Sequence, residues 1–277
     1  MMETPGWLHI ARGDAPLIVS IPHAGGEIRE DCWENLSDDG ALVRNDTDWW
    51  VDRLYQFAPE LGATVVQTRL SRTMIDVNRD PHGQSLYPGQ ATTELCPTTD
   101  FDGRPLYEGG RVPGPAEIAR RLAAYHRPYH DALSAEIERL KQIHGTIVLW
   151  DAHSIRSRIP RLFDGELPNL NFGTNGGASC SPGLIARLEA VAATSDYTHV
   201  TNGRFKGGYI TRHYGRPNDG VHAVQLELAQ RTYILEAPAG TISDGPPDFF
   251  VDRPRPIRTF LTRLLETCIA FATTERP

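Results

Sequence analysis

The chain has 277 residues, 40% of them hydrophobic, and carries a formal net charge of −7 at pH 7. This length and composition are sufficient for one sizeable hydrophobic core. The negative charge provides no general basic surface for nucleic acid or for an anionic membrane, so we expect neither as a partner. The cysteines have no C-x-x-C spacing, and we therefore expect reduced thiols rather than a zinc knuckle or a disulfide framework at Cys32, Cys96, Cys180 and Cys268.

The sequence gives no signal for a membrane or a secretory route. The segment Met1–Gly6 lacks a basic region followed by an apolar one. No stretch approaches the roughly 20 consecutive apolar residues that a membrane-spanning helix needs. We expect a cytoplasmic protein, and the sequence leaves its oligomeric state open.

Strand-like and helical segments alternate along the chain, which is typical of an α/β protein. In chain order, we predict strands at Leu17–Ile21, Ala63–Thr68, Thr146–Trp150 and Val221–Leu228. We predict helices at Asp46–Phe57, Ala116–Gln142, Leu184–Ala193 and Ile257–Cys268. Pro128 is expected to kink the second of these helices.

Two long stretches between these elements are predicted to be irregular. Residues 80–115 are rich in glycine and proline, and residues 157–182 contain the run Asn169–Gly177. A loop as long as the first one is usually a binding loop or a lid, so we expect it beside the functional site. No internal repeat and no polar linker divides the chain, and residues 1–277 are expected to form a single domain.

Two of the predicted strands lead to a histidine. His23 comes two residues after Leu17–Ile21, and His153 comes three residues after Thr146–Trp150. In an open α/β sheet the carboxyl ends of the strands face the ligand crevice, so both imidazoles are expected at the same edge. One such histidine alone is more often structural, but two of them with aspartates nearby favour a split metal site.

A catalytic zinc ion commonly has two histidines and one carboxylate as ligands and keeps a fourth position for water. Asp48 is the first choice for the carboxylate, because it lies in the opening turn of the predicted helix after the first strand. Asp46 and Glu27 remain alternatives, although Asp46 also suits a helix N-cap. Asp151 is expected to orient a ligand without touching the metal.

A carboxylate interrupts the apolar strand predicted at Val221–Leu228. An unpaired charge at Glu227 would be costly there, so it either pairs with a cation or acts as a general base and acid beside the metal. Strand alternation places Gln225 on the same face, and both are expected in one polar site. His222 faces the other way and is expected to be structural.

Basic residues suited to a substrate carboxylate follow the strand Ala63–Thr68. Asn78 adds an amide donor to the guanidinium fork of Arg79, and we predict that this pair binds a carboxylate. Arg72 either lies near the metal or forms an ordinary salt bridge with Asp76. Further anion contacts are predicted from a later segment, at Lys206, Gly207, Tyr209, Arg212 and Arg216.

These segments occur in the order seen in N-formylglutamate amidohydrolases, and the chain resembles that family from about Pro16 to Glu236. The segments that carry the resemblance are Pro22–Gly25, the helix start at Asp48 and Asp52, Asp76–Arg79, Asp151–Ser154, Lys206–Tyr209 and Gln225–Glu227. The resemblance implies a fold similar to that of zinc carboxypeptidases: one three-layer α/β domain around a central mixed, mostly parallel sheet.

The resemblance also implies how the site works. It implies one zinc ion per chain at His23 and His153, Glu227 as the catalytic carboxylate, and the Asn78–Arg79 pair on a substrate carboxylate. Carboxypeptidases have the metal-binding carboxylate three residues after the first histidine, whereas this chain has Gly26 there. The third ligand therefore stays open between Asp48 and its two alternatives.

The activity implied by the resemblance is hydrolysis of N-formyl-L-glutamate to formate and L-glutamate, the last step of a histidine degradation route. Glu227 would take a proton from the zinc-bound water and return it to the departing nitrogen, and Arg72 would share the charge of the oxyanion. Two alternatives remain: another N-acyl-amino-acid amidase or carboxypeptidase-like hydrolase, and a non-catalytic protein that binds anionic metabolites without metal. Substrate profiling tests the first, and metal analysis tests the second.

Overall fold

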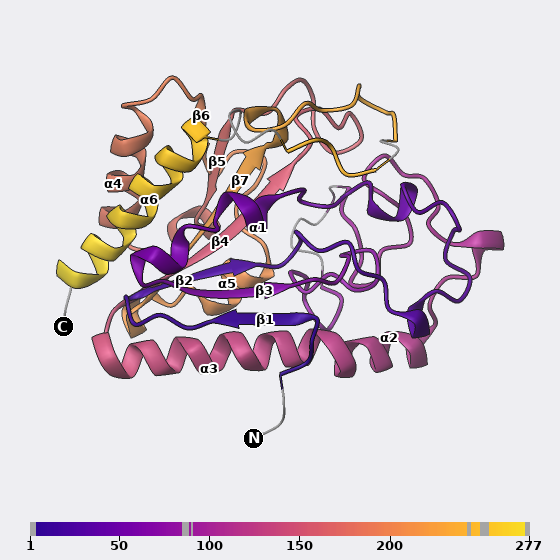
Figure 1. The fold of residues 1–277 in the computed structure, drawn as a ribbon, viewed down its shortest axis with the longest axis horizontal. Helices are drawn as coiled ribbons and strands as arrows, with labels where there is room; N and C mark the ends of the chain where they lie inside the picture. The colour runs from indigo at the N-terminus through magenta and orange to yellow at the C-terminus, as the bar shows by residue number, and fades with distance from the viewer. Residues whose placement is uncertain (1–3, 85–88, 90, 243–244, 250–254, 275–277) are drawn as a thin grey trace.

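The computed structural model describes residues 4–84, 89, 91–242, 245–249 and 255–274 (Figure 1). Its strands are β1 (Leu8–Ala11), β2 (Leu17–Ile21), β3 (Thr64–Thr68), β4 (Ile147–Ile155), β5 (Leu170–Gly173), β6 (His199–Thr201) and β7 (Val221–Ala229). Its α-helices are α1 (Val51–Leu54), α2 (Pro115–Arg121), α3 (Arg127–His144), α4 (Pro182–Ala192), α5 (Tyr209–Tyr214) and α6 (Arg255–Thr274). None of the helices in this part of the chain combines the length and apolar character that crossing a bilayer requires.

The strands form a seven-stranded sheet in the order β1-β3-β2-β4-β7-β5-β6. The four central strands, β3, β2, β4 and β7, are parallel to one another. At the two sides, β1 is antiparallel to β3 and β5 is antiparallel to β7, while β6 is parallel to β5. The prediction of a mixed, mostly parallel sheet is confirmed. The carboxyl ends of β2, β4 and β7 therefore lie at one edge of the sheet, where ligands bind in such folds.

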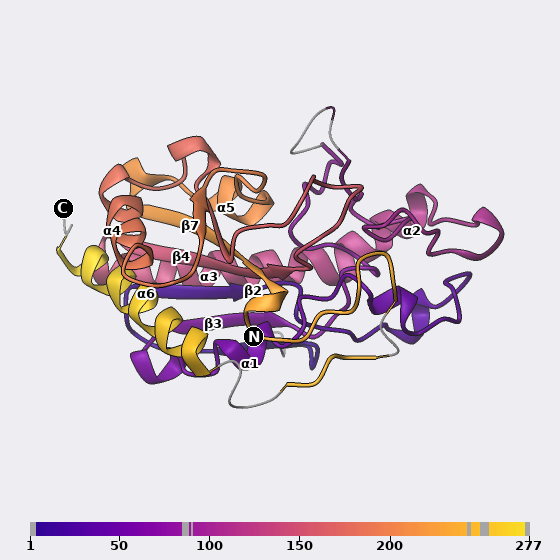
Figure 2. The same cartoon turned by 90° about the horizontal axis from the view of Figure 1, so that it is seen from above.

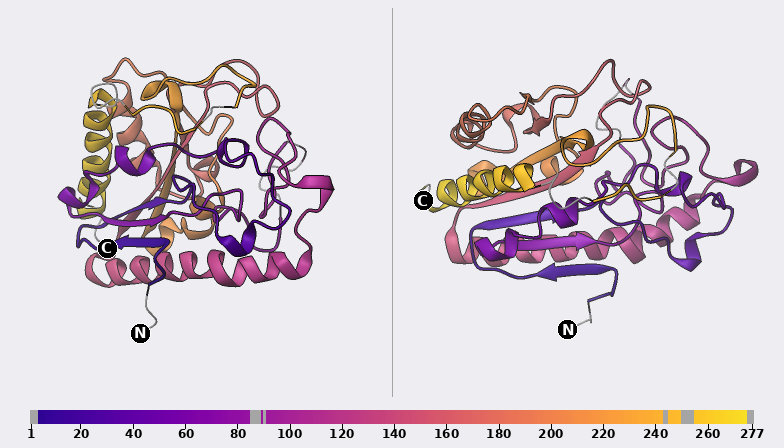
Figure 3. Two further views of the ribbon diagram at one scale, coloured as in Figure 1. Left: turned by 45° about the vertical axis from the view of Figure 1, so that its right-hand side comes forward. Right: turned by 45° about the horizontal axis from the view of Figure 1, so that its top comes forward.

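Helices cover both faces of the sheet, giving three layers (Figures 1 and 3). Leu17 and Val19 of β2 pack with α4 and α6 on one face, and Ile18 packs with α3 on the other. This alternation explains why β2 is apolar at nearly every position: a strand buried on both faces needs apolar side chains on both. The segments that follow β2 and β3 gather at the end of the molecule that lies to the right in Figures 1 and 2.

The predicted end of the strand before His153 is wrong. Strand β4 continues to Ile155 and pairs with β7 along its whole length, up to Ile155 beside Ala229. His153 therefore lies inside a strand and not in the loop after it. The polar residues from Asp151 onward resemble a strand end in sequence, but they are buried here because they line an internal site.

The helix predicted at Asp46–Phe57 is also wrong in most of its length, since only α1 is helical. Trp50 before it has a left-handed backbone (φ 62°), which a continuous right-handed helix excludes. This conformation is held by tertiary contacts: the Trp50 indole donates to the Pro247 carbonyl at 2.6 Å and lies 4.3 Å from the Arg53 guanidinium. Asp48 therefore lies in an irregular turn and not in the first turn of a helix.

Several short elements were not predicted. Strands β1 and β6 and helix α5 have four, three and six residues, which is too short to show a clear period in sequence. The stretch 157–182 was expected to be irregular, but it contains β5, whose backbone pairs with β7. The disturbance expected at Pro128 takes the form of a π-helical turn at Leu122–His126 between α2 and α3. A wider turn there suits a proline two residues later, whose nitrogen has no proton to donate.

Removing one buried hydroxyl tests the packing of α1 on the sheet. Trp150 in β4 donates its indole N–H to the Tyr55 hydroxyl at 2.9 Å, and both side chains are almost completely buried. Tyr55→Phe leaves this donor unpaired in the core, and we expect the free energy of unfolding to fall by about 1–3 kcal/mol in urea denaturation. Tyr197→Phe, at a partly exposed position, is the matched control and should change it by less than about 0.5 kcal/mol. Equal losses in both variants would show that the Tyr55 hydroxyl has no special role in the core.

Candidate active site

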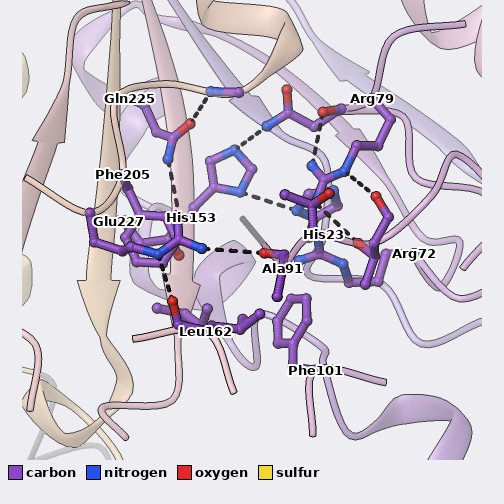
Figure 4. A pocket seen from close by; sticks show the side chains of 16 residues that line it. His23, Arg72, Arg79, Ala91, Phe101, His153, Leu162, Phe205, Gln225 and Glu227 are labelled. Atoms are coloured by element: carbon purple, nitrogen blue, oxygen red, sulfur yellow. Dashed lines mark hydrogen bonds between the residues drawn. The ribbon is translucent and has the colours of Figure 1, made fainter. Parts of the chain in front are cut away.

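A pocket opens at the carboxyl edge of the central strands. Its lining contains polar residues from β4, β7 and the segments after β2 and β3, many of which were predicted from the sequence (Figure 4). The predicted residues in this lining are His23, Arg72, Asn78, Arg79, His153, Gln225 and Glu227. The sequence therefore indicated most of the polar wall of this pocket, and the fold brings it together from four segments.

The register of β4 and β7 arranges the floor of the site. Asp151 lies beside Gln225, and His153 lies beside Glu227. In parallel strands such neighbours project from the same face, and here it is the face that α3 and α5 cover. His222 projects from the opposite face and packs edge-on against Phe271 of α6 with ring centroids 4.9 Å apart. This placement agrees with the structural role expected for His222.

Three side chains form a group that suits a metal ion. His23 Nδ1 and His153 Nδ1 are 3.2 Å apart, and Asp48 Oδ2 lies 3.7 Å from the first and 3.1 Å from the second. In tetrahedral zinc coordination with bonds near 2.0–2.1 Å, ligand atoms are roughly 3.3 Å apart. The three separations match that spacing, and all three residues are buried. Two histidines with one carboxylate are a donor set that zinc takes in catalytic sites.

The outer nitrogens of both histidines contact carboxylates. His23 Nε2 lies 2.6 Å from Asp76 Oδ1, and His153 Nε2 lies 3.1 Å from Asp151 Oδ1. Each Nδ1 therefore faces the other residues of the metal-binding group, and each Nε2 lies beside a carboxylate that could accept its proton if Nδ1 bound a metal ion. Asp151 was expected to orient a ligand in this way, whereas the contact between Asp76 and His23 was not expected. The Ser20 and Thr211 hydroxyls donate to Asp151 at 3.3 and 3.1 Å and hold it in place.

The two imidazoles have opposite pKa shifts. Burial and the nearby Arg72 cation lower the pKa of His23. Burial acts in the same direction on His153, but the carboxylates of Asp151 and Asp48 raise the pKa of His153 well above its ordinary value. A divalent cation at this position would require both Nδ1 atoms to be unprotonated, because only an unprotonated imidazole nitrogen binds metal.

The turn before α1 directs Asp48 towards the two histidines. The Asp48 backbone N–H donates to the His23 carbonyl at 3.0 Å, and its Oδ2 accepts the Ser154 N–H at 3.1 Å. The two alternative ligands lie elsewhere. Asp46 accepts the Phe101 N–H and pairs with Arg156, and the partly exposed Glu27 pairs with Arg29. Asp48 is thus the carboxylate that the fold brings to the histidines.

Glu227 is buried beside His153 and has one hydrogen bond to a neighbouring side chain. Gln225 Nε2 donates to its Oε2 at 3.2 Å. Burial raises the pKa of Glu227 to about 8, although the His153 cation acts to lower it. A carboxyl group with a pKa near neutrality can both accept and return a proton at working pH, which is what a general base and acid needs.

Arg72 forms the other side of the site. Its guanidinium donates to Asp76 at 2.8 Å, lies 3.5 Å from Asp48, and stacks 4.7 Å from the centre of the Phe101 ring. Arg72 is buried, and Asp76 is fully buried. The sequence left open whether Arg72 lies near the metal-binding group or pairs with Asp76, and the structure shows that it does both.

Asn78 and Arg79 both line the pocket, but their donors also have protein partners. Asn78 Oδ1 accepts the Ile210 N–H at 2.8 Å, and its Nδ2 lies 3.0 Å from His153 Nε2. Arg79 donates to the Thr93 carbonyl and hydroxyl at 3.1 Å and lies 3.5 Å from Asp76. Asn78 is therefore fixed as part of the support for His153, and Arg79 joins the pocket to the irregular stretch 80–115.

Within the segment Lys206–Tyr209, only Gly208 belongs to the described lining, and the rest lies behind the pocket. The Gly208 N–H donates to Gln225 Oε1 at 2.7 Å. A Cβ on Gly208 would lie 2.3 Å from Asn78 Nδ2. A glycine is required at this position because the Asn78 amide packs directly on its Cα. The Tyr209 ring packs instead against His213, with centroids 4.8 Å apart.

Three cations predicted near the substrate do not contribute to the described lining. Lys206 is exposed, Arg212 donates to the Gly207 carbonyl at 2.8 Å, and Arg216 lies 3.6 Å from Asp219. Arg204, which was not predicted from the sequence, is in the lining together with Phe205 and Phe101. Only its position two residues before Lys206 could have indicated it.

The comparison with known proteins agrees with this site. The family model described as N-formylglutamate amidohydrolase matches residues 15–234. The chain belongs to this family. An N-formylglutamate deformylase from Pseudomonas aeruginosa is 48% identical over 265 residues, which cover 95% of this chain and 96% of that protein. One from Pseudomonas putida is 46% identical with the same coverage. The chain is therefore an amidohydrolase.

Solved structures show the same fold. The crystal structure of an N-formylglutamate amidohydrolase from Ralstonia eutropha JMP134 has a TM-score of 0.76 with 25% sequence identity, covering 94% of this chain and 97% of that one. A gene product of Agrobacterium tumefaciens has a TM-score of 0.71 with 19% identity, covering 96% of both chains. The N-formylglutamate amidohydrolase fold thus persists where little sequence identity remains.

Asp76 offers a test of the charge arrangement around His23. Asp76→Asn removes the charge that faces Arg72, Arg79 and His23, and it leaves the buried Arg72 guanidinium without its 2.8 Å anionic partner. We expect the free energy of unfolding to fall by about 3 kcal/mol or more in chemical denaturation. Glu108→Gln breaks a 4.0 Å contact with Arg111 between exposed side chains and should cost less than about 0.5 kcal/mol. A loss for Asp76→Asn as small as that of the control would be inconsistent with this arrangement.

Proposed function

We propose that the protein hydrolyses N-formyl-L-glutamate to formate and L-glutamate with one zinc ion per chain, as the last step of a histidine degradation route. The observation that carries the metal part of this proposal is the group of His23 Nδ1, His153 Nδ1 and Asp48 Oδ2, with separations of 3.1–3.7 Å. The substrate part is supported by the relatives named N-formylglutamate deformylase.

His23, His153 and Asp48 would hold the zinc ion, with Asp76 and Asp151 fixing the two imidazoles from behind. When bound, zinc supplies a Lewis acid that polarises the formyl carbonyl and lowers the pKa of a water molecule toward about 7. Three protein ligands leave a coordination position for that chemistry. The remaining steps are the work of side chains in the pocket.

Glu227 is placed to move the proton. It lies beside His153 across the β4–β7 pair and lines the pocket. Its carboxylate takes a proton from the attacking water and then gives it to the amide nitrogen, which leaves as the amine of glutamate. Gln225 keeps the carboxyl group in position through its 3.2 Å hydrogen bond. Arg72, 3.5 Å from Asp48, faces the charge that develops on the formyl oxygen and stabilises it.

Arg79 is the cation for the α-carboxylate of the substrate. It lies in the pocket wall and is 3.5 Å from Asp76, which in turn contacts His23, so it lies close to the metal-binding group. The α-carboxylate is separated from the scissile C–N bond by the α-carbon alone and must also bind close to the metal. The arginine fork can bind a carboxylate through two parallel hydrogen bonds.

A formate-release assay tests the proposed reaction. With N-formyl-L-glutamate as substrate, we expect formate and glutamate in equal amounts, and a metal analysis should find close to one zinc ion per chain. A chelator should abolish turnover, and added zinc should restore it, because the imidazoles and Asp48 make no hydroxide by themselves. Full activity in zinc-free protein would refute the metal part. Stoichiometric zinc without formate release would refute the substrate part, and the absence of both would favour a binding protein.

Glu227→Gln tests the proton-transfer role. The amide keeps the size of the side chain but cannot accept a proton, so kcat should fall by about 10²–10⁴-fold. Zinc content should stay unchanged, since Glu227 is not among the three candidate ligands. Glu138→Gln, at an exposed position of α3, is the control and should retain full kcat. A Glu227→Gln enzyme with normal turnover would remove this residue from the mechanism.

A further inference from the structure

The described lining of the pocket contains three arginines, and two of them contact the carboxylates beside the histidines. Arg72 donates to Asp76 at 2.8 Å and lies 3.5 Å from Asp48. Arg79 lies 3.5 Å from Asp76. Both are therefore tied to the carboxylates that surround the metal-binding group. The third, Arg204, lies in the loop between β6 and α5 and reaches the pocket from another direction.

Arg204 is held between two walls of the pocket. Its Nε donates to the Leu162 carbonyl at 2.8 Å, and its Nη2 lies 3.4 Å from the Ala91 carbonyl (Figure 4). Its guanidinium lies 5.4 Å from the centre of the Phe205 ring, which packs edge-on against Phe163. These contacts fix the side chain in the pocket wall. A substrate carboxylate in the pocket would be a stronger acceptor for this guanidinium than a neutral carbonyl oxygen.

The shape of an N-formyl dicarboxylic amino acid requires a second cation farther from the metal. Three bonds separate the formyl carbon from the α-carboxylate carbon of N-formyl-glutamate, and five bonds separate it from the side-chain carboxylate carbon. Arg79 is close to the histidines through Asp76, whereas Arg204 is held by Leu162 and Ala91, which are not part of the metal-binding group. Arg204 thus offers a second cationic position in the same pocket, held by other residues than those that hold Arg79.

We propose that Arg204 is the specificity-determining residue that binds the side-chain carboxylate of the N-formyl amino acid. This inference rests on the proposed function, and it assigns to Arg204 an anion contact of the kind that was predicted from the sequence for Lys206, Arg212 and Arg216. The Phe205 face and Leu162 surround the guanidinium with apolar surface. In such surroundings a charged pair is stronger than in water. A substrate with a neutral side chain would not supply the carboxylate that this pair needs.

The test compares two substrates of nearly the same size, N-formyl-L-glutamate and N-formyl-L-glutamine, with zinc-loaded enzyme. For Arg204→Gln we expect kcat/KM to fall by about 30-fold or more with N-formyl-L-glutamate and by less than about threefold with N-formyl-L-glutamine. Arg204→Lys keeps the charge without the planar fork and should give an intermediate loss with the first substrate only. It also serves as the test variant if Arg204→Gln does not fold.

Two sets of variants give the comparison its controls. Arg158→Gln removes an exposed cation that pairs with Glu166 near the same wall, and it should leave both kcat/KM values unchanged. Arg79→Gln should lower kcat/KM with both substrates, because both carry an α-carboxylate.

An equal fall with both substrates in the Arg204 variants would overturn the proposal. The proposal would also be overturned if one of three other variants, Lys206→Gln, Arg212→Gln or Arg216→Gln, lowered kcat/KM with N-formyl-L-glutamate alone while Arg204→Gln left it unchanged. The unmodified enzyme separates this result from a failure of the proposed function. If the unmodified enzyme releases formate from N-formyl-L-glutamate and the Arg204 variants still prefer that substrate to N-formyl-L-glutamine to the same degree, only the role of Arg204 is wrong. If it releases no formate from either substrate, the proposed function itself fails.

Discussion

His23 and His153 present their Nδ1 atoms to each other across 3.2 Å inside a buried pocket, and much of the surrounding structure serves to hold that approach. Asp76 contacts the outer nitrogen of His23, while Asp151 and Asn78 contact that of His153, and these contacts fix the rotation of each ring about its side chain. Carboxylates behind ligating histidines also make the inner nitrogens more basic. Without these contacts, two buried imidazoles that close together would be free to turn away from each other.

Burying carboxylates beside the histidines is energetically unfavourable, and the arginines offset this cost. Asp48 and Asp76 are both buried near the histidines, and an uncompensated buried carboxylate is expensive. Arg72 lies between them, and Arg79 contacts Asp76 from the pocket side. The cations that stabilise the carboxylates therefore also line the pocket, so the arginines that support the metal-binding group are the same ones that the proposed anionic substrate would meet.

The sheet supplies the geometry that the charges need. Parallel pairing of β4 with β7 puts Glu227 beside His153, so the proposed proton-transfer group and a candidate metal ligand are neighbours through backbone pairing alone. The residues behind the histidines are tightly packed: a Cβ at Gly208 would lie only 2.3 Å from the Asn78 amide. A rigid backbone beneath the site keeps ligand positions within the small tolerance that catalysis allows.

Sequence reasoning identified residues better than it identified local structure. The two histidines, Glu227 and Gln225 were found because polar residues stand out against apolar strands, and this contrast results from burial, which acts at the level of the single residue. Asp48 was placed in a helix that does not form. At that place Trp50 has a left-handed backbone, and its side chain contacts Pro247 and Arg53. Pro247 is 197 positions away, and a contact with so distant a residue leaves no signal in the local sequence.

The sequence by itself determined the α/β class, the central strands and the residue types available for a metal site, because periodicity and hydrophobic contrast are local properties. Only the tertiary structure decided that Asp48 rather than Asp46 or Glu27 meets the histidines, and that Arg204 rather than Lys206 lines the pocket. Each choice depends on the path of an irregular segment between strands. Such a path is set by packing and hydrogen bonds with distant parts of the chain, which the order of residues does not reveal.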